Sequence, residues 1–400
     1  MKILLATFFT IPQEIGGFWP FISELKTGLI QEGFSVDILG RTADGLGYTL
    51  YCQNKIIRSV ELLPLVKKQL LQSLNQLPPE NYEIQRYGLE LAAAAFDLSQ
   101  YDLIHCQDVI AGHALSRVKL ASTPLITSVH GSLPLASMHL LKQGNSQLSS
   151  KECEETAIYR YNMALEFAGL QESNLIHTSS IWFRKQLKER YNIPHEKMVT
   201  IPYGLRIDSH IKEEVSSLKR NPDKKIIIYT GRLTAIKGIS YLIHALFELK
   251  KTRSDWECWV IGDGERKEEY ISKARELDLL DQIKFFGKRN DVFSLLKKSD
   301  IFVLPSLQDN QPYSLMEAQF AGLSSVVTKT GGLPEMVRHG INGLLVNPAS
   351  HQELFYAMQQ LLEQDNLRSF LGNQAKKSAE NTWCFQKMIK KIITMYKMVV

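Results

Sequence analysis

The sequence predicts an α/β protein of two Rossmann-like domains that face a central cleft. Short apolar runs bounded by turn residues alternate with amphipathic stretches of helical length along most of the chain, which is the pattern of parallel βαβ units. A polar, charged stretch at 208–225 interrupts this alternation, which then restarts. The 400 residues also exceed one ordinary domain. We therefore predict an N-terminal domain over 1–204, a second domain over 205–381 and a C-terminal helix over 382–400.

The first half carries six apolar runs that we interpret as strands: Lys2–Phe8, Ser35–Leu39, Asp102–Cys106, Pro124–Val129, Asn174–Thr178 and Met198–Ile201. Residues 41–100 break the alternation with helical patterns at Val60–Leu74 and Tyr82–Phe96, which predicts an excursion over one rim of the sheet. The segment Gly131–Ser150 is rich in Ser, Gly and Leu without a clear period, and it predicts a mobile loop.

The second half repeats the alternation with six further runs: Lys225–Thr230, Glu257–Ile261, Ile283–Phe286, Asp300–Leu304, Ser324–Thr328 and Gly343–Val346. Ser350 and Glu353 form a capping box that opens a helix running to about Leu362.

Composition limits the class of protein. Apolar residues make up 44% and charged residues 22% of the chain, which excludes a disordered, collagen-like or disulfide-scaffolded protein. A net charge of +5 gives no argument for a nucleic-acid partner. The five cysteines are scattered without metal-ligand spacing and predict reduced thiols in a cytoplasmic protein. Met1–Thr10 is read as a buried strand rather than a signal peptide, and no apolar run reaches the 18 residues that a membrane span needs.

Ligands of open α/β sheets bind outside the carboxyl ends of the strands. Gly231–Gly238 follows the run Lys225–Thr230 and places Arg232 and Lys237 at such an end. Two cations beside flexible glycines suit a diphosphate. Two solvated surface cations are the alternative interpretation.

The segment Leu304–Ala318 leads from a strand into a helix that begins near Pro312 and ends before Gly322. Asp309 or Asn310 is expected to cap this helix, whose free N–H groups would face an anion. Glu317 lies eight residues beyond Asp309, so the two carboxylates could approach one pocket. A solvated helix start is the alternative.

Three further strand ends carry weaker signals. Thr330–Glu335 contains paired glycines before a helix start at Leu333, and it is either a ligand loop or a plain βα turn. Gly16 and Gly17 follow the first strand, as in a phosphate-approaching loop. His130 follows the strand Pro124–Val129, where its imidazole could donate to a hydroxyl or make a structural hydrogen bond.

The chain contains no Walker A loop, HExxH, GxSxG or Asp-x-Asp triplet. We therefore expect no metal and no cofactor, with cations and helix termini handling a diphosphate.

Taken together, the Gly-Arg-Leu-x3-Lys-Gly segment, the strand ending Phe302–Ser306, the acid-x7-Glu spacing and Gly-Gly-Leu-Pro-Glu resemble the retaining family-4 glycosyltransferases of GT-B fold. These motifs occur in the family's order, and the resemblance covers nearly the whole chain, most strongly Ile226–Leu362. It implies an enzyme that moves a sugar from a nucleotide diphosphate sugar, with UDP-sugars the first expectation, to a hydroxyl acceptor.

The resemblance also implies roles for single residues. Arg232 and Lys237 would hold the donor diphosphate and stabilise the departing nucleotide without a metal. Asp309 and His130 would lie beside the donor sugar, and Glu317 would bind the ribose. The remaining donor contacts would come from Gly16 and Gly17 under the diphosphate, Gly287 and Lys288 at the nucleobase, and the segment Asn310, Gln311, Pro312, Tyr313, Ser314 and Leu315.

The chain departs from the family at two positions. Asp309 stands where the family has Glu, and its side chain is one methylene shorter, so the choice of sugar is left open. Tyr203 stands where the family usually has Asn. The acceptor is expected at 41–100 and 131–150. These segments carry no readable acceptor code, so a carbohydrate, a glycolipid, a small molecule and a protein are all left open.

The final helical pattern carries aromatic residues among Lys387, Lys390, Lys391 and Lys397. In the family this helix crosses back onto the first domain, which would bury Trp383, Phe385 and Tyr396. Contact of its lysines with a membrane surface is the alternative. A sugar-nucleotide epimerase and a non-catalytic sugar-nucleotide binder are the alternative functions.

Overall fold

The computed structural model describes residues 1–12, 18–70, 82–145, 147–207 and 218–400. The chain divides into two compact units. The first unit comprises Met1–Ser179, Phe183–Ile201 and Ile389–Val400, and the second comprises Ser180–Trp182 and Pro202–Met388. No helix within the described ranges is long and apolar enough to cross a membrane.

The described part of the first unit holds a sheet of eight strands in the order β4-β3-β2-β1-β5-β6-β7-β8. Its strands are β1 (Lys2–Ile11), β2 (Ser35–Thr42), β3 (Gly47–Leu50), β4 (Lys55–Arg58), β5 (Leu103–Cys106), β6 (Leu125–Val129), β7 (Leu175–Thr178) and β8 (Met198–Thr200). All pairs are parallel except β2–β3 and β3–β4. The six predicted strands of this half are confirmed.

Residues 41–100 extend the sheet instead of only covering its rim. Strands β3 and β4 form a hairpin through a 3-10 turn at Tyr51–Gln53, which ends at Asn54 with φ 52°. The sequence analysis missed this hairpin because each strand has only four residues. The Tyr48 hydroxyl donates to the carbonyl of Gln85 at 2.8 Å and so ties the hairpin to the helix α3 (Tyr82–Ala95).

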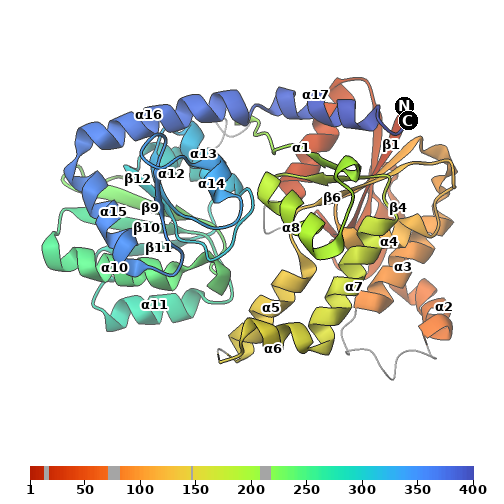
Figure 1. The fold of residues 1–400 in the computed structure, drawn as a ribbon, viewed down its shortest axis with the longest axis horizontal. Coiled ribbons are helices and arrows are strands. Elements are labelled where there is room, and N and C mark those ends of the chain that lie inside the picture. The colour runs from red at the N-terminus through yellow and green to blue at the C-terminus, as the bar shows by residue number, and fades with distance from the viewer. Residues whose placement is uncertain (13–17, 71–81, 146, 208–217) are drawn as a thin grey trace. The chain divides into compact units, whose positions relative to one another are not determined.

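Helices pack against this sheet, and α3, α4 and α7 lie side by side (Figure 1). The helices of the N-terminal half are α1 (Phe18–Gln31), α2 (Ser59–Leu70), α3 (Tyr82–Ala95), α4 (Val109–Ser116), α5 (Leu133–Gly144), α6 (Ser150–Glu155), α7 (Ala157–Gln171) and α8 (Ile181–Tyr191), with 3-10 turns at Leu98–Gln100 and His195–Lys197.

The prediction of a mobile loop over Gly131–Ser150 is wrong, because α5 occupies most of that segment. Pro134 lies in the first turn of α5, where a proline needs no N–H partner. Ser149 forms a capping box with Glu152 that starts the next helix, α6. These local start signals outweigh the missing hydrophobic period.

The second unit contains a parallel sheet of six described strands in the order β11-β10-β9-β12-β13-β14. Its strands are β9 (Lys225–Thr230), β10 (Trp256–Ile261), β11 (Ile283–Gly287), β12 (Ile301–Leu304), β13 (Ser324–Thr328) and β14 (Leu344–Val346). Each agrees with its predicted run to within one residue. The order runs outward from β9 to β11 on one side and from β12 to β14 on the other.

The helices of the C-terminal half are α10 (Ile239–Thr252), α11 (Lys267–Glu276), α12 (Val292–Lys297), α13 (Tyr313–Phe320), α14 (Leu333–Met336), α15 (His351–Glu363), α16 (Asp365–Thr382) and α17 (Phe385–Tyr396), with a 3-10 turn at Ala235–Lys237. Helix α15 packs beside α10 (Figure 1). Its N-cap is Ser350, whose Oγ accepts from the N–H of Glu353 at 3.3 Å, but the predicted capping box is incomplete because the Glu353 carboxylate accepts from the N–H of Asn347 at 2.7 Å.

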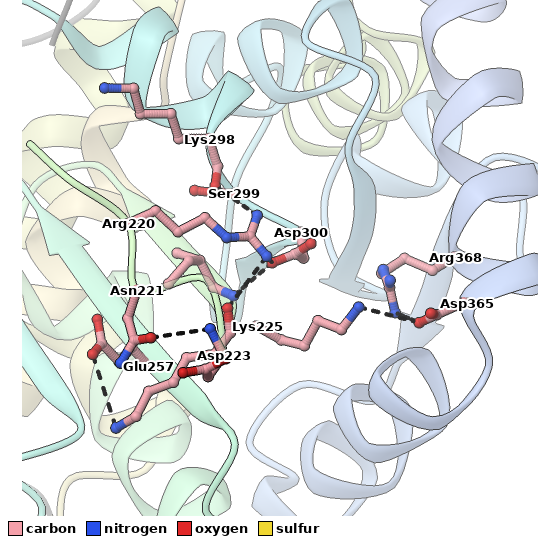
Figure 2. A network of polar contacts seen from close by, with 12 residues as sticks. Arg220, Asn221, Asp223, Lys225, Glu257, Lys298, Ser299, Asp300, Asp365 and Arg368 are labelled. Atoms are coloured by element: carbon pink, nitrogen blue, oxygen red, sulfur yellow. Dashed lines mark hydrogen bonds and ion pairs between the residues drawn. The ribbon is translucent and has the colours of Figure 1, made fainter.

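Charged side chains hold the amino ends of the strands in the second unit (Figure 2). Asp300 Oδ2 lies 2.8 Å from Arg220 Nη2 and accepts from the N–H of Ile226 at 2.7 Å. Lys225 Nζ lies 3.4 Å from Asp365 Oδ1. This network links the segment that precedes β9 to the start of β12 and to α16. It lies at the amino ends of the strands, opposite their carboxyl ends.

Residues Ile389–Val400 of the C-terminal segment belong to the first unit, where they complete a buried polar chain. Tyr396 lies 2.8 Å from His105 Nδ1, and Ser128 Oγ lies 2.7 Å from both His105 Nε2 and His177 Nδ1. His177 Nε2 ends the chain on the carbonyl of Ile201 at 2.8 Å. Because His177 donates to that carbonyl, its Nδ1 accepts from Ser128, which in turn accepts from His105, and Tyr396 donates to His105.

Candidate active site

The order of the second sheet reverses between β9 and β12, which are neighbours. Such a switch point is where open α/β sheets bind ligands, because the loops leaving the two strands diverge there. Gly231–Gly238 follows β9, and 305–312 follows β12. The topology therefore brings together the two segments with the strongest predicted chemistry.

Backbone contacts fix the segment that carries Arg232 and Lys237. The Tyr229 hydroxyl donates to the carbonyl of Arg232 at 2.8 Å, and the Leu233 N–H donates to the carbonyl of Asp263 at 2.9 Å. Gly238 adopts φ +68° and lies so close to β12 that a Cβ there would come within 2.0 Å of the Pro305 carbonyl oxygen. The glycine thus allows this loop to pack against the neighbouring one.

Lys237 and Asp309 join the two loops directly. Lys237 Nζ lies 2.6 Å from Asp309 Oδ2, and their side chains are 15% and 12% exposed. Ser306 Oγ donates to the same carboxylate oxygen at 3.0 Å. The expectation that Asp309 or Asn310 caps α13 is wrong: Pro312 occupies the N-cap position and makes no side-chain capping bond. The lysine across the switch point competes for the Asp309 carboxylate.

The paired glycines after β13 support the Asp309 loop from the other side. Gly332 donates its N–H to the carbonyl of Asp309 at 3.0 Å. Gly331 has φ +57°, and a Cβ on it would lie 1.7 Å from the same carbonyl oxygen. These positions exclude any larger side chain.

Gln311 is buried, and its side chain hydrogen-bonds to the backbone of Tyr203. Its Oε1 accepts from the Tyr203 N–H at 2.8 Å, and its Nε2 donates to the Tyr203 carbonyl at 3.3 Å. The rings of Tyr203 and Tyr313 stack with centroids 5.9 Å apart. Leu315 is fully buried in the core, so only its backbone remains for a ligand role. Pro312 and Ser314 are partly exposed.

The remaining predicted residues of the second unit lie around these loops. Arg232 is exposed, and its side chain makes no hydrogen bond or ion pair with the part of the chain that the structure describes. Glu317 is half-buried on α13. Gly287 ends β11 with φ +68°, its carbonyl accepts from the Gly262 N–H at 2.8 Å, and the next residue, Lys288, is exposed.

The sequence analysis missed two threonine hydroxyls, one at the carboxyl end of β9 and one in the loop that follows it. Thr230 Oγ1, at the end of β9, and Thr234 Oγ1 are buried, and neither has a hydrogen-bond partner among the described residues. A buried hydroxyl without a partner is unfavourable and marks a position where a ligand could supply one. The signal in the sequence is a polar residue closing an otherwise apolar strand.

His130 of the first unit follows β6, as predicted. Its ring meets the Phe21 ring edge-on with centroids 5.0 Å apart, and Nε2 lies 3.4 Å from Gln107 Oε1. Burial, with a smaller contribution from His177, lowers the pKa of His130 to about 3, so the imidazole is neutral near pH 7. The other predicted residues of this half, Gly16 and Gly17, lie outside the described residues.

Burial also perturbs a group beside the switch point. The pKa of Tyr229 is raised well above its ordinary value, first by burial and then by the Asp309 carboxylate. Its hydroxyl therefore stays protonated and keeps donating to the Arg232 carbonyl. Across the described residues, no cluster of three or more His, Cys, Asp or Glu side chains could hold a metal ion.

Two protein families match adjacent parts of this chain. "Glycosyltransferase Family 4" matches residues 15–209, and "Glycosyl transferases group 1" matches residues 210–378. An uncharacterised glycosyltransferase of Methanocaldococcus jannaschii is 25% identical over 99% of this chain and 98% of its own length.

Solved structures show the same fold. A sucrose-phosphate synthase from Thermosynechococcus elongatus superposes with a TM-score of 0.77 at 18% identity, covering 100% of this chain and 98% of that one. HepE of Anabaena, crystallised in complex with UDP, superposes with a TM-score of 0.70 at 19% identity, covering 99% of this chain and 100% of that one.

Proposed function

Because the chain belongs to the family-4 glycosyltransferases, which have the GT-B fold and retain the anomeric configuration, we propose that it transfers a hexose from a UDP-sugar to a hydroxyl acceptor. The observation that carries the proposal is the meeting of Lys237 and Asp309 at the switch point, with Arg232 exposed beside them. UDP is favoured as the nucleotide because HepE, of the same fold, was crystallised with it.

The second unit supplies the donor contacts. Arg232 and Lys237 bind the diphosphate, as a forked guanidinium and a compact ammonium can do together. Asp309 contacts the sugar, and Glu317 binds the ribose hydroxyls. The backbone at Gly287 and Lys288 faces the nucleobase, and the backbone of 310–315 contacts sugar and phosphate.

The first unit supplies His130 beside the donor sugar and Gly16 and Gly17 under the diphosphate. The neutral imidazole suits hydrogen bonding to a sugar hydroxyl. An acceptor contacts the segments 41–100 and 131–150, and a carbohydrate, a glycolipid or a small molecule would each supply the hydroxyl. The exposed lysines of α17 would favour peripheral contact of the enzyme with an anionic membrane.

The reaction is a front-face substitution. The bond from the anomeric carbon to the phosphate oxygen breaks, and the acceptor oxygen bonds to that carbon from the same face. The acceptor proton passes to the departing phosphate. Arg232 and Lys237 stabilise the charge that builds on the nucleotide, which is the task a metal ion performs in other transferases.

The test is release of nucleoside diphosphate from a panel of UDP-, GDP- and ADP-sugars, with and without EDTA, beside a Glu317→Ala control. Release from one donor that is insensitive to EDTA and lost in the variant supports a metal-independent transferase and names its sugar. Rearrangement of the donor sugar without transfer would favour an epimerase. Thermal stabilisation by nucleotide without turnover, across a panel of acceptors, would favour a binding protein.

A further inference from the structure

We propose that Glu166 is a positioning residue, whose buried carboxylate fixes the backbone that carries His130. The inference rests on the proposed function, which gives His130 a role beside the donor sugar. Glu166 lies within α7 and is 0% exposed, so it cannot touch a substrate itself. A carboxylate without solvent is costly unless donors surround it.

Four donors meet the two oxygens of Glu166. Oε2 accepts from the N–H of Leu133 at 2.7 Å. Oε1 accepts from the Tyr191 hydroxyl at 2.8 Å and from Ser132 Oγ at 3.2 Å, and it lies 3.5 Å from Arg190 Nη1. Each contacting group donates to the carboxylate in this arrangement, and the Tyr191 and Ser132 hydroxyls could also accept from an amide.

These contacts replace an ordinary helix cap. Ser132 is the N-cap of α5, yet its side chain makes no capping bond and instead accepts from Arg190 Nη1 at 2.9 Å. The first N–H of α5 is satisfied by Glu166, whose negative charge also suits a helix N-terminus. Three residues, 130–132, separate the end of β6 from Leu133. With both ends held, the backbone of His130 has little room to move.

The imidazole of His130 is oriented separately. The Gln107 side chain donates from Nε2 to the carbonyl of His105 at 3.1 Å, which turns its Oε1 toward His130 Nε2. This arrangement assigns the proton of the neutral ring to Nε2. Glu166 thus sets where the ring lies, and Gln107 sets which nitrogen donates.

The experiment compares Glu166→Ala with His130→Ala, the double variant and a matched control, Asp37→Ala. Asp37 is also buried and lies outside the proposed acceptor segments; its Oδ2 accepts from the Tyr101 hydroxyl at 2.7 Å and lies 3.6 Å from Lys2 Nζ. We expect Glu166→Ala to lower kcat for UDP release ~10- to 100-fold, because misplacement of a reacting contact is that costly. The donor KM changes less than kcat, since the second unit holds the nucleotide. Asp37→Ala loses thermal stability but keeps kcat.

The Glu166→Gln variant and the double variant distinguish a positioning role of Glu166 from a general contribution to folding stability. Glu166→Gln keeps an oxygen for the Leu133 N–H and is expected to retain most of kcat. In the His130→Ala background, Glu166→Ala should lower kcat little further. If His130→Ala lowers kcat while folded Glu166→Ala does not, or if their effects multiply, the positioning role is wrong.

Imidazole NMR distinguishes failure of this inference from failure of the proposed function. If His130→Ala leaves kcat unchanged, the role given to His130 in the reaction fails, and the His130 resonances, assigned with that variant, decide the inference alone. They should shift in Glu166→Ala, and unchanged resonances would overturn it. If Glu166→Ala does not fold, Ser132→Ala takes its place, with the same resonance shift and a several-fold lower kcat expected.

Discussion

The ammonium of Lys237 lies 2.6 Å from Asp309 Oδ2 and joins the loops that follow β9 and β12. A lysine proposed to bind phosphate therefore already has an anionic partner. A bound diphosphate has to share the ammonium with Asp309 or displace it. The pair is the most specific link between the sequence motifs and the geometry of the second unit.

Replacing Asp309 with Asn is expected to tighten UDP binding. The substitution removes a negative charge that competes with phosphate for Lys237 but keeps a side chain of the same shape. We expect about a fivefold lower Kd, since unit charges ~4 Å apart interact by ~1 kcal/mol at the permittivity of water. Calorimetric titration with UDP in dilute buffer measures this gain, which should shrink at ~1 M salt. An unchanged Kd would mean that Asp309 does not compete with the phosphates.

Arg232→Ala and Arg220→Ala should separate activity from stability. Arg232 is exposed and makes no ion pair with the described residues, so its loss should change the free energy of unfolding by less than about 0.5 kcal/mol. Turnover should fall ~100-fold because a cation facing the leaving phosphate is lost. Arg220 is ion-paired with Asp300 at the amino ends of the strands, away from the site. Arg220→Ala should therefore lower the free energy of unfolding by about 1 kcal/mol and leave turnover unchanged. Full activity in Arg232→Ala would refute the phosphate assignment.

Gly331→Ala should raise the Kd for UDP beyond what its loss of folding stability explains. A Cβ at this position would lie 1.7 Å from the Asp309 carbonyl oxygen, so the Asp309 loop has to move. The control is Gly340→Ala, because Gly340 also has a positive φ, +74°, but nothing lies within 4 Å of its Cβ position. We expect the control to lose ~1 kcal/mol of stability through its backbone conformation alone and to bind UDP normally. Equal Kd values for the two variants would argue against a role for the loop.

Acid should destabilise the first unit through its buried histidines. Burial lowers the pKa of His177 to about 4 and the pKa of His105 well below 6.5. The unfolded chain takes up protons near pH 6.5 while the folded chain does not. Stability is therefore complete above about pH 6.5 and is lost as the pH falls toward 4, by about 3 kcal/mol for His177.

Thermal unfolding between pH 7 and pH 4 measures this loss. Comparison with His177→Gln isolates the histidine from the carboxyl groups that titrate in the same range, because the variant should lose less stability on acidification. Tyr396→Phe is a second probe. It removes the donor to His105 Nδ1 and should cost about 1–2 kcal/mol at every pH in the range. Parallel pH profiles for the wild type and His177→Gln would contradict the assignment.

The parallel strands were predictable because each is a short apolar run flanked by turn residues, as at Lys225–Thr230. The β3–β4 hairpin was not, because its stability comes from pairing with β2 and from contacts such as Tyr48 with Gln85. Helix α5 was missed because its residues show no clear hydrophobic period, although Pro134 marks its start. Its first N–H is satisfied by Glu166, which lies 33 residues away. A partner so distant leaves no local pattern.

At the site, spacing and residue type predicted that Arg232, Lys237 and Asp309 would gather at one edge of a sheet. They did not predict the direction of the Asp309 side chain, which depends on a lysine from a different loop. They also did not predict that the Gln311 side chain is taken up by the backbone of Tyr203, which leaves the predicted donor contact to the Gln311 main chain. When a side chain has several possible partners, the folded structure determines which of them it contacts.

The buried chain from Tyr396 to Ile201 has a consequence for synthesis on the ribosome. Its two end residues are separated by Pro202–Met388, nearly all of the second unit, so the first unit lacks Tyr396 and its neighbours until that stretch has been translated. At ordinary elongation rates this delay is ~10–40 s. During it the nascent first unit lacks the buried side chains of Ile389, Ile392 and Met395, so the apolar surface that they contact stays exposed. The half of the chain made first is thus completed last.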